Sequence, residues 1–160
     1  NRGFVLQNNW KKLYDEVRSF KETAGKIKIK AILGVGDLET LRNVAKASLV
    51  CMMAGADFIK TSTGKESTNA NLNNSLVMLR MIREFHSKTG KKIGFKPAGG
   101  ISTAKSVLEF LILVAEELGF DWVKPNLLRI GASSLLIDIE RQLYHYTSGR
   151  YANKEKLAIG

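Results

Sequence analysis

A lysine at the end of an apolar segment is the residue of this chain best placed to do chemistry. Residues 56–65 read ADFIKTSTGK, so Lys60 follows a short apolar run and precedes a turn rich in Thr, Ser and Gly. Burial of the base of this side chain would favour the uncharged amine, which can attack a carbonyl carbon. Many buried strands end on a solvated lysine, so this motif alone leaves a structural role for Lys60 open.

Two further segments repeat the design. Residues 92–101, KIGFKPAGGI, contain a short apolar strand with Lys96 at its end, followed by a Pro-Ala-Gly-Gly turn. Residues 127–134, LLRIGASS, run from an apolar strand into Gly131 and two hydroxyl side chains. Helical periodicity follows each strand, which is typical of a parallel sheet with its functional groups at the carboxyl ends of the strands. We therefore expect both lysines and the three small-residue turns to share one edge.

The second lysine explains how the first could react near neutral pH. Like-charge repulsion from Lys96 on the neighbouring strand would disfavour the charged form of Lys60 in a dry cleft. A neutral Lys60 amine could then add to an aldehyde, lose water and give an iminium that accepts electrons. The alternative for Lys96, a lysine that pairs with phosphate or lies on the surface, stays open.

The three segments DFIKTSTGK, GFKPAGGI and RIGASSLL, in this order and spacing, resemble the signature segments of the deoxyribose-phosphate aldolases, class I (Schiff-base) aldolases. The resemblance extends from Asn1 to about Tyr151. It implies an α/β fold, the (β/α)8 TIM barrel. Residues 1–160 would form the carboxyl-terminal portion of this single domain, covering its last four to five βα units, with a peripheral tail from about residue 149.

The resemblance also implies roles for individual residues. Lys60 would form the Schiff base, and Lys96 would be the second catalytic lysine. The phosphate of the substrate would lie on the N–H groups of three glycines and at the amino end of a helix near Ser133. The implied phosphate-binding set is Thr63, Gly64, Lys65, Gly99, Gly100, Gly131, Ser133 and Ser134. The implied reaction is the reversible cleavage of 2-deoxyribose 5-phosphate to glyceraldehyde 3-phosphate and acetaldehyde, with no metal or organic cofactor.

The length of the chain departs from the family pattern. A (β/α)8 barrel needs about 250 residues, and this chain has 160. The proton-relaying aspartate of the family is expected just upstream of Asn1, and the role of a carboxyl-terminal tyrosine cannot be carried over to a chain that ends at Gly160. We therefore expect the 160-residue chain alone to be inactive. Two alternatives stay open: a non-catalytic half-barrel that binds a phosphorylated ligand or a partner, and a Schiff-base lyase for another phosphorylated sugar.

Composition narrows the class of protein. No apolar run approaches the length of a membrane span, and Cys51 is the single cysteine, which excludes an internal disulfide; we expect a cytoplasmic protein. Lys and Arg number 25 against 15 Asp and Glu, but no aromatic residues alternate with the basic ones, so no nucleic-acid partner is expected. His86 and His145 lack neighbours at metal-ligand spacing. Open strand edges would favour a homo-oligomer.

Periodicity and capping residues predict the order of elements. The prediction begins with a helix capped by Asn8 or Asn9 and ended by Gly25. The further elements are a strand within residues 27–33, a helix capped by Asp37 that runs to about Met53, a helix from Leu72 to Gly90, a helix capped by Ser102 that reaches Leu118, and a last helix over residues 135–146.

Overall fold

The sheet of this protein consists of parallel strands. The structure is a computed structural model that describes residues 1–153 and 157. β1 (Lys30–Ile32), β2 (Phe58–Lys60) and β3 (Gly94–Lys96) form a three-stranded sheet in that order. All neighbours are parallel, which confirms the expected α/β class. The predicted last strand is represented by two isolated bridges beside β3, from Phe95 to Leu128 and from Ala98 to Gly131.

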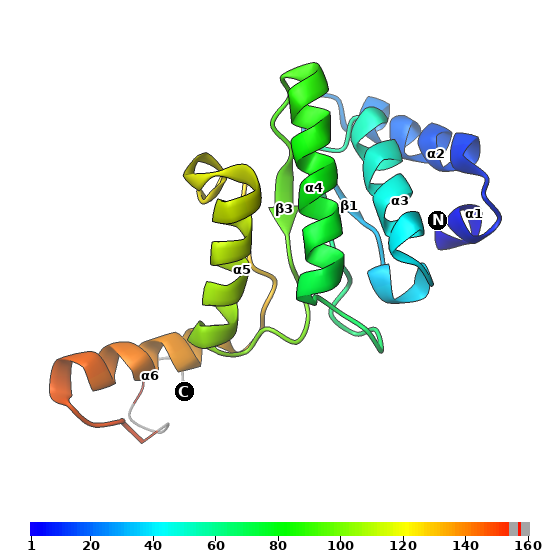
Figure 1. Ribbon diagram of the computed structural model, residues 1–160. Coiled ribbons are helices and arrows are strands. Elements are labelled where there is room, and N and C mark those ends of the chain that lie inside the picture. Colours follow the sequence, from blue (N-terminus) through cyan, green and yellow to red (C-terminus); the bar gives the residue numbers. More distant parts are fainter. Residues whose placement is uncertain (154–156, 158–160) are drawn as a thin grey trace.

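Helices alternate with the strands along the chain and cover one face of the sheet. Figure 1 shows α3, α4 and α5 side by side in front of the strands, while α6 extends away from them. The helices are α1 (Arg2–Leu6), α2 (Trp10–Ala24), α3 (Leu41–Met53), α4 (Leu72–Thr89), α5 (Ala104–Leu118) and α6 (Leu135–Ser148), with short 3-10 helices η1 (Val35–Asp37) and η2 (Phe120–Trp122). The expected tail from residue 149 lies partly outside the described residues.

Most helix boundaries agree with the prediction, with two corrections. Asn9 caps α2, because its side chain accepts a hydrogen bond from the N–H of Lys12. Asp37 does not cap α3: it belongs to η1, and Thr40 caps the helix instead. The chain makes an extra 3-10 turn that buries Leu38 completely, which delays the start of the helix.

The second correction concerns α5. Thr103, and not Ser102, caps this helix, since Thr103 and Ser106 exchange side-chain and backbone hydrogen bonds in a capping box. Such a box satisfies two of the backbone donors that a helix leaves unpaired at its amino end. The prediction therefore missed the start of this helix by one residue.

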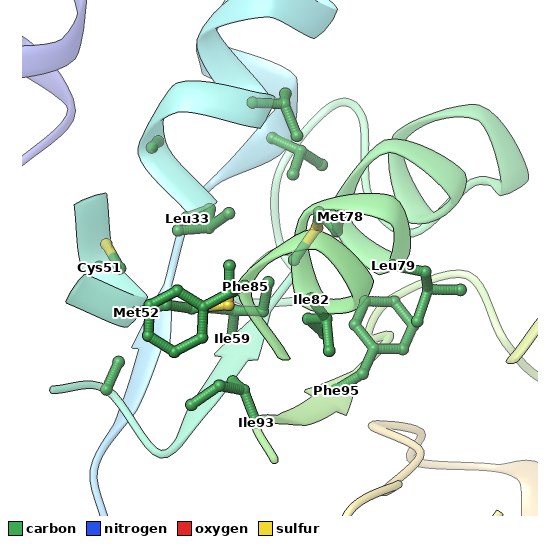
Figure 2. Close-up of a cluster of buried hydrophobic side chains, with 14 of the residues drawn as sticks. Leu33, Cys51, Met52, Ile59, Met78, Leu79, Ile82, Phe85, Ile93 and Phe95 are labelled. Atoms are coloured by element: carbon green, nitrogen blue, oxygen red, sulfur yellow. The ribbon is translucent and has the colours of Figure 1, made fainter. Parts of the chain in front are cut away.

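The hydrophobic core lies between the sheet and its helices. Ile59 of β2 and Phe95 of β3 are fully buried and point toward α4, whose Met78, Leu79 and Ile82 are equally inaccessible (Figure 2). Truncating a side chain in such a core typically costs about 2 to 5 kcal/mol. This packing fixes the strands, and with them the positions of the residues at their ends.

The opposite face of the sheet carries the residues that alternate with this core. Strand side chains point to opposite faces with a period of two, so Ile59 faces the helices while Phe58 and Lys60 face away. On the same outer face, Ile32 of β1 keeps 48% of its surface exposed. Within residues 1–153 and 157, no helix covers this face. No helix in the same ranges is long and apolar enough to cross a membrane.

Candidate active site

Strand pairing places the two predicted lysines next to each other. Lys60 and Lys96 are the last residues of β2 and β3 and are direct partners in the parallel register. Parallel strands lie about 4.8 Å apart, so the two side chains leave neighbouring points on the same face of the sheet. Both residues are half-buried. The expectation that the strand ends bring these lysines together is therefore confirmed for their backbone positions.

Two further cations, Lys30 and Arg129, lie on the same face of the sheet as Lys60 and Lys96. Burial lowers the pKa of Lys96, and the charges of Lys60 and Arg129 lower it further. Burial also lowers the pKa of Lys30, with additional contributions from Lys96, Arg129 and Lys60. None of these four cations has a carboxylate within ion-pair distance among the residues that the structure describes. The lysine pair thus belongs to a larger positive cluster.

An aromatic ring supports the two additional cations. The Lys30 ammonium lies 5.3 Å from the centre of the Phe58 ring, and the Arg129 guanidinium lies 5.5 Å from it. Both distances permit cation–π attraction. The ring extends over Gly94, where an added Cβ would come within 2.2 Å of it. Glycine at position 94 therefore makes room for the ring that holds Lys30 and Arg129.

A cavity of about 400 Å³ opens beside the lysine pair. Its wall contains Lys60 and the complete predicted phosphate set, namely Thr63, Gly64, Lys65, Gly99, Gly100, Gly131, Ser133 and Ser134. Lys96 is not part of the wall. Its Cε would lie 3.0 Å from a Cβ added at Gly131, so this glycine leaves space for the Lys96 side chain at the edge of the cavity.

The glycines of this cavity differ in what their N–H groups do. The N–H of Gly99 donates to the carbonyl of Gly131 at 3.2 Å, and the N–H of Gly131 donates to the carbonyl of Pro97 at 2.8 Å. Contrary to expectation, these two N–H groups are therefore engaged in strand pairing and are not free to hold a phosphate. Among the described residues, the N–H groups of Gly64 and Gly100 have no protein acceptor.

The helix at the end of the cavity begins where the periodicity predicts. α6 starts at Leu135, with Ser134 as its capping residue, so the phosphate position expected near Ser133 lies just before its amino end. The Ser134 side chain makes no capping hydrogen bond. Its hydroxyl and the exposed hydroxyl of Ser133 consequently remain available to a ligand, together with the unpaired N–H groups of the first helical turn.

Comparison with known proteins shows the family of the chain. Residues 3–136 match the model of the DeoC/LacD family aldolases. The chain belongs to this family. It is 60% identical over 152 residues to human deoxyribose-phosphate aldolase, a match that covers 95% of this chain and 48% of the human protein. The mouse protein of the same name is 61% identical over 152 residues, with the same coverage. The chain thus spans about half the length of these relatives.

Solved structures agree at the level of the fold. One is the crystal structure of the apo form of a Toxoplasma gondii ME49 protein classed with the deoxyribose-phosphate aldolases. It superposes on this chain with a TM-score of 0.76 at 21% identity, and the match covers 91% of this chain and 56% of that protein. The aldolase QR15 gives a TM-score of 0.64 at 24% identity, with coverage of 92% and 57%. The strands and helices of this chain are therefore arranged like those in about half of each of these longer proteins.

Sequence reasoning missed the residues that brace the site of this aldolase-family chain. The Thr61 hydroxyl donates to the carbonyl of Ala98 at 3.2 Å and accepts from the N–H of Ala98 at 3.0 Å. The Ser62 hydroxyl donates to the same carbonyl at 2.6 Å, and the N–H of Ala70 donates to it at 3.1 Å. The signal in the sequence that could have indicated this bracing is the pair of hydroxyl residues directly after Lys60. The Thr61 and Ser62 hydroxyls join the turn after β2 to the turn after β3.

Proposed function

We propose that residues 1–160 form the carboxyl-terminal portion of one (β/α)8 barrel. The alternation of parallel strands and helices supports this, as does the coverage of about half of each relative. β1 is the edge of the sheet, and a cavity of about 330 Å³ lies along it, walled by side chains such as Val5, Leu13 and Val17 from α1 and α2. An additional apolar strand beside β1 would fill this cavity.

The proposed activity is the reversible cleavage of 2-deoxy-D-ribose 5-phosphate to D-glyceraldehyde 3-phosphate and acetaldehyde. The relatives named deoxyribose-phosphate aldolase suggest this substrate. The observation that carries the proposal is the position of Lys60, beside Lys96 in the strand register and within the same cavity as all eight candidate phosphate ligands. One side chain can then react with the aldehyde while the phosphate is held in the same cavity. A cytoplasmic location and homo-oligomer formation remain predictions.

The chemistry follows from an amine placed against an aldehyde. The Lys60 amine adds to C1 of the open-chain sugar, and loss of water gives a protonated imine. A base removes the proton of the C3 hydroxyl, the C2–C3 bond breaks, and its electron pair moves to C2 as the imine becomes an enamine. Glyceraldehyde 3-phosphate leaves, C2 is protonated, and hydrolysis releases acetaldehyde and the amine. Lys96 would keep a second positive charge beside this amine throughout the cycle.

Phosphate would be held at the other end of the cavity. Within the described part of the chain, the donors that can converge on it are the unpaired N–H groups of Gly64 and Gly100, the hydroxyls of Ser133 and Ser134, and the Lys65 ammonium. Backbone N–H groups and a helix amino end favour an anion. Gly99 and Gly131 would let the ligand approach the backbone closely, because they have no side chain, but their N–H groups would not donate to the phosphate.

Borohydride trapping tests the nucleophile. Acetaldehyde and borohydride should add an ethyl group to the Lys60 amine of the whole polypeptide that contains these residues, detected by peptide mass spectrometry. Lys60→Arg should abolish both trapping and turnover, because a guanidinium stays protonated. Lys105→Arg on the exposed side of α5 is the matched control and should keep both. Trapping at another lysine, or turnover by Lys60→Arg above a few per cent of the parent rate, would refute the assignment.

The second lysine has a separate test. Lys96→Leu removes the positive charge beside Lys60 and should lower kcat more than it raises KM. An unchanged kcat with a raised KM would instead make Lys96 a phosphate ligand.

A further inference from the structure

A buried carboxylate lies behind the turn that lines the phosphate end of the cavity. The Glu66 side chain is only 10% exposed. Its Oε1 accepts hydrogen bonds from both the N–H and the hydroxyl of Thr63, each at 3.1 Å. The same hydroxyl accepts a bond from the N–H of Lys65 at 3.3 Å. One carboxylate oxygen thereby holds the turn of residues 63–65 in shape. The Gly64 N–H, which lies between these bonds, has no acceptor in residues 1–153 and 157.

The charge of this carboxylate needs compensation. Glu66 Oε2 is buried and has no hydrogen-bond partner within the described part of the chain. A negative charge directly behind an anion cavity would repel phosphate. The positive group that faces it is the Arg2 guanidinium, whose Nη1 lies 3.9 Å from Oε1 and which also pairs with Asp37 of η1. Arg2 therefore links α1, η1 and the turn after β2 through charge.

We propose that Glu66 and Arg2 act as a positioning pair for phosphate binding. Glu66 shapes the turn of residues 63–65 so that the Gly64 N–H and the Lys65 ammonium are available. Arg2, which also pairs with Asp37, offsets part of the negative charge of Glu66, so the turn attracts an anion better than it would without Arg2. This inference rests on the proposed function for its substrate. Neither residue is part of the cavity wall, so both act through the turn and not by touching the sugar.

Kinetics with two substrates separate this role from general support of the fold. We would measure kcat/KM of the whole polypeptide for 2-deoxyribose 5-phosphate and for 2-deoxyribose, which lacks the phosphate. Loss of the shaped turn should lower the ratio of the two values, mainly through KM of the phosphorylated sugar. A merely structural role would lower both values together and leave the ratio unchanged.

The variants give different expected outcomes. Glu66→Ala removes the acceptor and should lower the ratio by about 10-fold or more. Glu66→Gln keeps an oxygen acceptor without the charge, and its ratio should stay within about 3-fold of the parent. Arg2→Ala removes the positive charge that faces the carboxylate and should lower the ratio by about 2- to 5-fold. Adding Glu66→Gln to Arg2→Ala removes the negative charge of that carboxylate and should restore the ratio. Glu109→Ala, an exposed residue of α5, is the control.

Two results would overturn the inference: an unchanged ratio in Glu66→Ala, or an Arg2→Ala loss that Glu66→Gln does not rescue. Titration with inorganic phosphate, followed through the amide signal of Gly64, provides a readout independent of turnover. A parent protein that cleaves neither sugar would refute the proposed function. The phosphate titration would still decide the inference, since Glu66→Ala must weaken phosphate binding and Glu66→Gln must not.

Discussion

Gly131→Ala is the substitution for which the structure gives the clearest expected cost. The new methyl group would lie 2.5 Å from the Ala98 Cβ and 3.0 Å from the Lys96 Cε. Contacts below 3.0 Å between carbon atoms force the surroundings to move, and such overpacking typically costs about 1 to 3 kcal/mol. At about 2 kcal/mol, the melting temperature of a domain of this size should fall by roughly 4 to 8 °C.

A compensating substitution separates stability from activity. Ala98→Gly removes the methyl group that collides at 2.5 Å but leaves the 3.0 Å approach to Lys96. Gly131→Ala should also lower kcat, because the new methyl group pushes against the Lys96 side chain. The double variant should therefore recover most of the lost melting temperature, measured by calorimetry, while its kcat stays low because the contact with Lys96 persists. A Gly131→Ala protein with the parent melting temperature and the parent kcat would show that the close packing around this glycine has been misjudged.

Three further outcomes are expected from other residues. Arg129→Gln removes one of the charges that lower the pKa of Lys96, so this pKa should rise. With Lys96 in its proposed catalytic role as a charged group, the alkaline limb of the pH–rate profile should then move to higher pH, and an unmoved limb would contradict the effect of Arg129 on Lys96. Gly94→Ala should displace the Phe58 ring and destabilise the protein by about 1 to 3 kcal/mol in denaturant unfolding, and a neutral result would contradict the packing. Burial raises the pKa of Cys51 to about 12, so iodoacetamide at pH 8 should modify it only after denaturation; fast labelling of the native protein would contradict its burial.

Sequence motifs within one segment identified residues that the structure brings to one cavity. Lys60 and the turn after it were recognisable because an apolar run ends there, and the structure places Thr63, Gly64 and Lys65 on the same cavity. The cations at positions 30 and 129 were missed because they join the lysine pair only through strand pairing. Period-two alternation indicates which face a residue takes, but it does not indicate which strand lies beside it.

Other misses come from competition between local and tertiary interactions. Asp37 is a good capping residue, yet burial of Leu38 favours a further turn of chain before Thr40 begins the helix. The glycine N–H groups at 99 and 131 looked like free donors in the sequence, whereas pairing between the two segments uses both. Neither outcome can be derived from residue types alone, because each depends on a contact between segments distant in the chain.

The carbonyl of Ala98 accepts hydrogen bonds from three groups of the segment after β2, namely the Thr61 and Ser62 hydroxyls and the Ala70 N–H. Residues 61–70 and 97–99 therefore constitute a single module, although residues 71–96 separate them in the chain. Anyone who transplants the lysine-bearing loop into another scaffold to create a new aldolase should move both segments at once. A graft of residues 61–70 alone would leave the buried Thr61 hydroxyl without its partners at Ala98. A graft of residues 97–99 alone would leave the Ala98 N–H and carbonyl without theirs, so directed evolution of one segment would be constrained by the other.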